Sequence, residues 1–142
     1  VLQVGSHTLK SWSTTQNVVA LSSGEAEFYG LVKGASMGLG MKTLLKEFGV
    51  ELGLCIKIDA SAAKGIASRR GNGKVRHIEV NQLRIQEKVA DGTLIIQKIA
   101  TSENIADHLT NYLNEEKIFE HMNGTGQWIE SGRHPLIPKV SR

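Results

Sequence analysis

Three acidic residues occupy positions from which carboxylates often do chemistry. Asp59 directly follows Leu54–Ile58, a short apolar run that is typical of a buried parallel strand. Ligand sites in open α/β sheets lie beyond the carboxyl ends of such strands. Glu27 and Asp107 lie in the first turns of two predicted helices. If the three carboxylates converge, they offer the oxygen ligands that Mg²⁺ prefers. Two such ions about 3.5–4 Å apart are a standard arrangement for phosphodiester hydrolysis.

Each of these acids also has a purely structural interpretation. An aspartate after a strand often only caps the next helix. Acidic residues in the first turn of a helix are favoured by the helix dipole alone. The residue pattern by itself therefore favours structural roles over metal binding.

The elements that must position these acids follow from hydrophobic periodicity and from capping and turn signals. Ser22–Glu25 has the spacing of a capping box, so it predicts the start of a long helix that ends at Gly49. The glycines within this helix indicate either close packing or sequence drift. The other predicted elements are a hairpin of Val1–Val4 and Thr8–Ser13, the strand Leu54–Ile58, the helices Ser61–Arg69 and Glu79–Val89, the strand Thr93–Ile99, and a last helix Glu103–Leu113 capped by Thr101 or Ser102.

This order of elements predicts the fold class and the domain organisation. Strands come first and then alternate with helices, which favours an α/β fold with a mixed sheet and helices packed against it. The periodic pattern weakens from Asn114 on, where glycines and prolines follow. We therefore interpret residues 1–113 as one domain and residues 114–142 as a C-terminal extension or tail.

Composition narrows the class of protein. The chain is 40% hydrophobic but only 5% aromatic, so its core must be aliphatic. A net charge of +3 permits a nucleic-acid partner without requiring one. Cys55 is the single cysteine, which excludes an intramolecular disulfide and a thiolate metal cluster and fits an intracellular setting. Neither a membrane-spanning run nor a signal peptide is evident, so no membrane partner is expected. Val1 stands where a Met would begin a chain, and we expect the natural protein to start further upstream.

Four blocks of the sequence, in this order, resemble the ribonuclease H region of copia-type retrotransposon polyproteins. The first contains a tryptophan strand, a polar turn and Ala-Leu-Ser-Ser-Gly-Glu-Ala-Glu-Phe, and the last contains Asn-Ile-Ala-Asp-His-Leu-Thr. Together the blocks cover roughly residues 1 to 113. They are Lys10–Gly30, Ile58–Ala67, Val75–Leu94 and Thr101–Leu113.

The resemblance implies a ribonuclease H-like mixed sheet with flanking helices and assigns roles to the acids. The family's second, third and fourth catalytic acids fall on Glu27, Asp59 and Asp107, which would also bind two Mg²⁺ ions. Glu25 competes with Glu27, and helical periodicity does not separate them. Similarity to the wider ribonuclease H pattern favours Glu27, which leaves the capping role to Glu25.

The resemblance also implies a partner, an RNA–DNA hybrid made by the reverse transcriptase part of the same polyprotein. Phosphates and 2′-hydroxyls would provide most contacts, without sequence readout. We expect His77 to contact substrate or support the structure rather than act in catalysis. An ordinary solvated loop is the alternative for the basic stretch. The candidate nucleic-acid-binding residues are Lys64, Arg69, Arg70, Lys74, Arg76 and His77.

One departure from the family bears on activity. The family's first catalytic aspartate lies on a central strand upstream of the hairpin, whereas here no acidic residue precedes Glu25. We therefore expect the domain to be incomplete at its N-terminus, with that strand missing. Two hypotheses follow: an endonuclease domain that cleaves the RNA strand of hybrids, in a cytoplasmic particle or the nucleus, or an inactive remnant of a mobile element that at most binds nucleic acid weakly.

Overall fold

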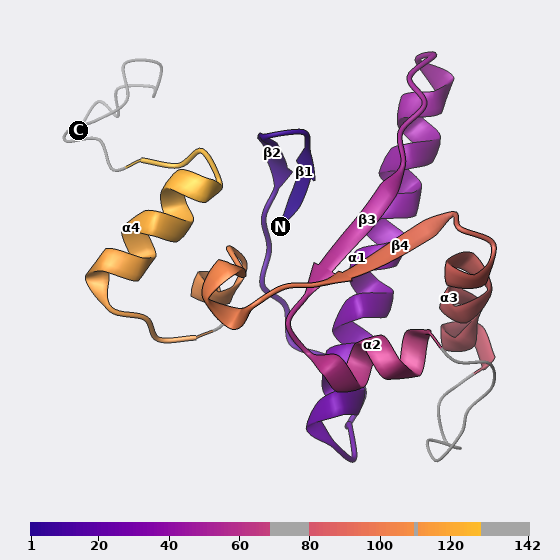
Figure 1. Cartoon of the computed structure of the whole chain (residues 1–142), viewed down its shortest axis with the longest axis horizontal. Helices are drawn as coiled ribbons and strands as arrows, with labels where there is room; N and C mark the ends of the chain where they lie inside the picture. The colour runs from indigo at the N-terminus through magenta and orange to yellow at the C-terminus, as the bar shows by residue number, and fades with distance from the viewer. Residues whose placement is uncertain (69–79, 110, 129–142) are drawn as a thin grey trace, which may run out of the picture.

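Strands and helices alternate along the chain after an N-terminal hairpin (Figure 1). The computed structural model describes residues 1–68, 80–109 and 111–128, without the side chains of residues 80–83 and 108. The predicted α/β class is confirmed. The elements are β1 (Leu2–Val4), β2 (His7–Lys10), α1 (Ser23–Glu47), β3 (Leu54–Ile58), α2 (Ser61–Ala67), α3 (Val80–Ala90), β4 (Leu94–Lys98), the 3₁₀ turns η1 (Thr101–Glu103) and η2 (Asp107–Leu109), and α4 (Glu115–Gly124).

Helix α1 begins with the capping arrangement that the sequence predicts. The Ser22 hydroxyl oxygen accepts a hydrogen bond from the backbone N–H of Glu25 at 3.2 Å. The Glu25 carboxylate accepts in turn from the N–H of Leu21 at 3.0 Å. The first bond satisfies a backbone donor that the first turn of a helix leaves without an intrahelical partner, and the second holds the residue that precedes the N-cap. At the other end Gly49 adopts a φ of +78°, a left-handed conformation that glycine reaches at little cost.

Strand pairing differs from the single mixed sheet that was predicted. Among the described residues, β1 and β2 form one antiparallel pair, and β3 and β4 form a separate parallel pair. The parallel register runs from Leu54 opposite Leu94 to Ile58 opposite Lys98. A cavity of about 1080 Å³, lined by residues of both β1 and β3, lies between the two pairs.

The core lies on one face of the β3–β4 pair, which α1, α2 and α3 cover (Figure 1). Leu54, Ile56 and Ile58 alternate with the exposed Cys55 and Lys57, as expected of a strand with one covered face. The predicted aliphatic core is confirmed, with Phe28 as its one aromatic member among the described residues. The buried apolar residues are Phe28, Leu31, Ala35, Ile58, Ala63, Ile66, Ala67, Ile85 and Leu94.

The segment after β4 corrects the prediction of a helix over Glu103–Leu113. Among the described residues of this stretch, the structure has only the short turns η1 and η2, separated by residues 104–106, with Asn104 in an extended conformation. The Asn104 side-chain oxygen accepts from the N–H of Ala106 at 3.2 Å. Asparagine breaks helices in this way, because its side chain competes for backbone donors.

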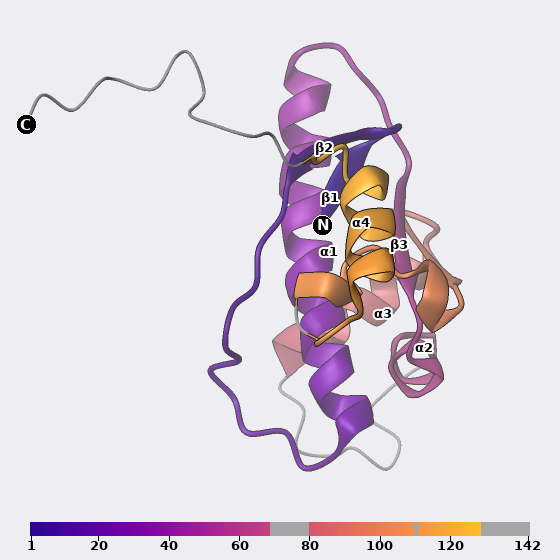
Figure 2. The same ribbon diagram turned by 90° about the vertical axis from the view of Figure 1, so that its left-hand side faces the viewer.

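Helix α4 falls within residues 114–142, which the sequence pattern assigned to a C-terminal extension or tail. It begins at Asn114, whose side-chain oxygen accepts from the N–H of Lys117 at 3.1 Å. Gln3 of β1 donates to the carbonyl of Gly124 at 3.0 Å, which ties α4 to the hairpin. Figure 2 shows α4 in front of α1, and the stretch after β2 running along α1 toward its first turn. No helix in the described ranges is long and apolar enough to cross a membrane.

Candidate active site

A cavity of about 400 Å³ lies at the carboxyl end of β3, and all three predicted catalytic acids line it. Glu27 comes from the second turn of α1, Asp59 directly follows β3, and Asp107 begins η2. Three elements that are distant in sequence therefore present carboxylates to one space. Trp12, Lys57, Asn104 and Asn111 also contribute to its walls.

The two candidate glutamates of α1 have different environments. Glu25 is 1% exposed and accepts a hydrogen bond from the Tyr29 hydroxyl at 2.6 Å, in addition to its capping bond with Leu21. Glu27 is exposed and lines the cavity. The predicted capping role of Glu25 is confirmed, and Glu27 is the glutamate that faces the predicted site.

The carboxylates of Glu27 and Asp59 lie close enough for their negative charges to repel each other. Partial burial raises the pKa of Glu27, and the nearby charge of Asp59 raises that pKa further. The side chain as a whole is exposed, so the burial concerns its carboxyl end at the cavity wall. A bound cation would relieve the repulsion that raises this pKa.

Two asparagines that sequence reasoning missed hold two of these acids. The Asn104 amide donates to the Asp59 carboxylate at 3.3 Å, and the Asn111 amide donates to the Asp107 carboxylate. A signal for Asn111 was present, since it lies four residues after Asp107, the spacing of neighbours on one face of a helical turn. Asn104 begins the Asn-Ile-Ala-Asp block, but its contact with Asp59 spans 45 residues and leaves no local pattern.

The acids share a cavity without forming a ready-made metal centre. Within residues 1–68, 80–109 and 111–128, no three histidine, cysteine, aspartate or glutamate side chains lie close enough together to hold a metal ion. The expected convergence into one cluster a few ångströms across is therefore not seen. The donor chemistry nevertheless fits a hard divalent cation, since the lining includes three carboxylates and two side-chain amides.

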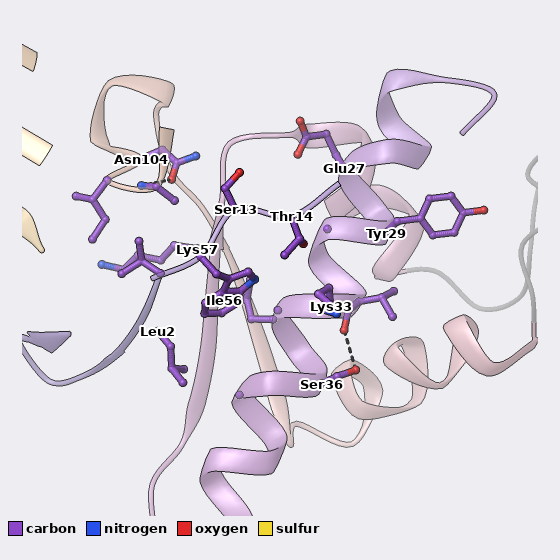
Figure 3. Close-up of a pocket in the computed structure, with 18 of the residues that line it drawn as sticks. Leu2, Ser13, Thr14, Glu27, Tyr29, Lys33, Ser36, Ile56, Lys57 and Asn104 are labelled. Carbon is purple, nitrogen blue, oxygen red and sulfur yellow. Dashed lines mark hydrogen bonds between the residues drawn. The ribbon is translucent and has the colours of Figure 1, made fainter. Parts of the chain in front are cut away.

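The larger cavity adjoins the smaller one, and Glu27, Lys57 and Asn104 line both. Figure 3 shows Glu27 on α1 and Asn104 on the loop after η1 at the upper end of this space, with Leu2, Ile56 and Lys57 below. The residues of β1 and β3 in its walls belong to strands that pair on one side only among the described residues. The cavity thus lies between two free strand edges.

Most of the predicted nucleic-acid contacts cannot be placed. Lys64 lies in α2, is half-buried and lines neither cavity. Lys57, which sequence reasoning missed, is the lysine nearest the acids along β3 and shares their cavity. Its position two residues before Asp59 puts it on the same face of the strand. The other predicted contacts lie outside the described residues: Arg69, Arg70, Lys74, Arg76 and His77.

Comparison with known proteins identifies a homologous segment of a polyprotein. The chain is 32% identical over 110 residues to the retrovirus-related Pol polyprotein from transposon TNT 1-94 of Nicotiana tabacum. The match includes 75% of this chain but only 8% of the length of that polyprotein. No protein-family model and no solved structure matches the chain. The similarity supports an origin of this chain in the Pol polyprotein of a retrotransposon.

Proposed function

We propose that this chain is part of a ribonuclease H-like nuclease domain of a Pol polyprotein, and that the intact domain cleaves the RNA strand of RNA–DNA hybrids. The observation that carries the proposal is the cavity at the carboxyl end of β3, which Glu27, Asp59 and Asp107 line together. Similarity to a segment of a retrovirus-related Pol polyprotein supports it. The ribonuclease H resemblance implies that the reverse transcriptase part of the same polyprotein makes the hybrid.

The chain's own residues would contribute charge and position. When bound, two Mg²⁺ ions would activate the attacking water and stabilise the leaving oxygen. Glu27, Asp59 and Asp107 would supply the negative oxygens that hold them. Lys57 lines the same cavity, where its charge would attract a substrate phosphate.

The larger cavity supports a further part of this proposal. Residues of β3 and of β1 both line it, so an extended segment placed there would lie beside an edge of each strand. A strand from elsewhere in the polyprotein, with an aspartate near Glu27, would join the two sheets. It would also supply the fourth carboxylate that the ribonuclease H resemblance implies.

The test compares two versions of the protein on a labelled RNA–DNA hybrid with Mg²⁺. We expect the 142-residue chain to show no useful cleavage and a version extended upstream by about one strand with its aspartate to cleave. Robust metal-dependent cleavage by the short chain would contradict the need for that strand. Absence of cleavage by both versions would contradict the nuclease proposal.

An inactive remnant of a mobile element is the second candidate. The observation that favours it is the lack, among the described residues, of a close group of metal-binding side chains. Such a remnant would bind hybrids weakly and in a salt-dependent way. Electrophoretic mobility shifts with the extended version, without cleavage in Mg²⁺ or Mn²⁺, would support the remnant.

A further inference from the structure

We propose that Asn104 is a positioning residue that fixes the carboxylate of Asp59 relative to Asp107. The inference rests on the proposed function, because it assigns a role within the same cavity. Asn104 is half-buried in the extended link between η1 and η2 and lines both cavities.

Hydrogen bonds at both the oxygen and the nitrogen of its side-chain amide fix the orientation of Asn104. Its oxygen accepts from the backbone N–H of Ala106 at 3.2 Å, so its amide nitrogen must face the other way. There the nitrogen donates to Oδ2 of Asp59 at 3.3 Å. An aspartate in place of Asn104 would keep the first bond but set a second negative oxygen against Asp59.

The backbone of Asn104 reaches the other acid. Its carbonyl accepts from the N–H of Asp107 at 3.0 Å, and its own N–H donates to the carbonyl of Thr101 at 3.1 Å. One residue thus contacts the carboxylate that follows β3 and the start of η2, which carries Asp107. Because Asp59 and Asn104 are 45 positions apart, this contact sets the relative position of two separate segments.

Asn111 offers a matched control. Its side-chain amide donates to Oδ1 of Asp107, and its backbone N–H donates to the carbonyl of Asp107 at 2.9 Å. Both bonds are local, so the loss of the Asn111 amide changes the surroundings of Asp107 without breaking the contact with Asp59.

The first arm of the test needs no metal. Backbone amide resonances of the ¹⁵N-labelled 142-residue chain are compared with those of Asn104→Ala and Asn111→Ala in EDTA. We expect Asn104→Ala to shift the resonances of Asp59 and Asp107, and Asn111→Ala to shift that of Asp107 but not that of Asp59. An unmoved Asp59 resonance in Asn104→Ala would overturn the proposed contact.

The second arm measures Mn²⁺ binding by the electron paramagnetic resonance of the free ion. Loss of a residue that orients a metal ligand commonly weakens affinity on the order of 10–100-fold. We expect Asn104→Ala to weaken Mn²⁺ binding roughly tenfold, with a smaller effect in Asn111→Ala. Asn104→Gln, which keeps an amide, should recover part of the affinity. Thermal melts in EDTA identify any variant that fails to fold. If Asn104→Ala does not fold, Asn104→Ser, whose side chain is too short to reach Asp59, replaces it in both arms, with the same expected results.

Asp59→Asn separates failure of the proposal from failure of the proposed function. If the unaltered chain binds Mn²⁺ no better than Asp59→Asn, the metal site and the function built on it are wrong. If binding depends on Asp59 but Asn104→Ala leaves it unchanged, Asn104 does not position that ligand and only the further inference is overturned.

Discussion

The cavity that Glu27, Asp59 and Asp107 line lies between two regions of the molecule, one held together by a buried apolar core and the other by hydrogen bonds. Helices α1, α2 and α3 and the β3–β4 pair contain every member of the buried apolar core. The hairpin, η1, η2 and α4 contribute none of it, and contacts such as the Gln3–Gly124 hydrogen bond hold them. Glu27 and Asp59 belong to the packed region, whereas Asp107 belongs to the other. Glu27 and Asp59 are thus positioned by the apolar core, whereas the position of Asp107 depends on hydrogen bonds within the second region. The geometry of the site therefore depends on how that second region is held.

The largest expected effect is the loss of cleavage when Glu27, in the packed region, is changed. In an upstream-extended version that cleaves hybrids, Glu27→Gln should abolish cleavage, because it removes a charged cation ligand and keeps its shape. Glu25→Gln should retain cleavage and lower the free energy of unfolding by about 1 kcal/mol, as for a lost cap. Rates and urea unfolding of both variants provide the measurement. The opposite assignment would exchange the roles of the two glutamates.

The next effect tests how unequally the two regions are packed. Phe28 is 0% exposed in the core, whereas Phe119 on α4 is 41% exposed. Phe28→Ala should lower the free energy of unfolding by about 3–5 kcal/mol, the usual effect of an emptied aromatic site. Phe119→Ala should lower it by less than about 1 kcal/mol. Equal losses in denaturant unfolding would show that α4 shares the core.

A smaller effect separates two glycines of α1. A Cβ atom on Gly38 would meet the Leu54 side chain at 2.6 Å, whereas one on Gly40 would meet nothing within 4 Å. Gly38→Ala should therefore force the Leu54 side chain to shift and destabilise the chain by about 1 kcal/mol. Gly40→Ala should stabilise it by about 0.5–1 kcal/mol through helix propensity. Thermal melts of Gly38→Ala and Gly40→Ala provide the measurement. If both variants were destabilised, the claim that only Gly38 of the two is in close contact would be wrong.

The smallest effect is the pH dependence of stability in EDTA. Burial and the charge of Asp59 raise the pKa of Glu27, so the folded chain holds this proton more tightly than the unfolded chain. The stability that Glu27 contributes is therefore present at low pH. It is lost as pH rises from the ordinary glutamate range through the raised pKa. Glu27→Gln should melt higher than the unaltered chain above this window and equally below it.

Asp91 provides a control of opposite sign. The side-chain and backbone hydrogen bonds with Thr93 lower the pKa of Asp91, so its contribution is present at neutral pH and lost as pH falls. Asp91→Asn should therefore matter near neutral pH and not in acid. Near neutral pH, Asp91→Asn should melt lower than the unaltered chain, whereas Glu27→Gln should melt higher. If Glu27→Gln also melted lower there, the proposed surroundings of Glu27 would be wrong.

Local signals account for what the sequence predicted well. The strand Leu54–Ile58 was predicted with its observed bounds, and the cap at Ser22 correctly placed the start of α1. Both depend on neighbours within a few residues. The close packing of Gly38 was left open, because it depends on Leu54 across the core.

Long-range or competing interactions account for the rest. The helix expected after Thr101 is broken by the Asn104 side chain, which competes with the helical pattern of Ile105 and Leu109. The sequence pattern also did not predict that the strands form two separate pairs, because periodicity along a strand does not report which strands lie side by side. The contact between Asn104 and Asp59 also joins residues that are distant in the sequence, so no local pattern predicts it.

The parallel pairing of β3 with β4 has a consequence for folding kinetics. Leu54 and its partner Leu94 are 40 positions apart, so they pair only when the chain between them closes a long loop. Because closure entropy must be overcome before such distant contacts form, parallel pairs are slow steps in folding. The hairpin and α1 depend on near neighbours and can form early, whereas Asp59 meets Asn104 only once this pair has closed. The carboxylate site is thus among the last parts of the chain to assemble.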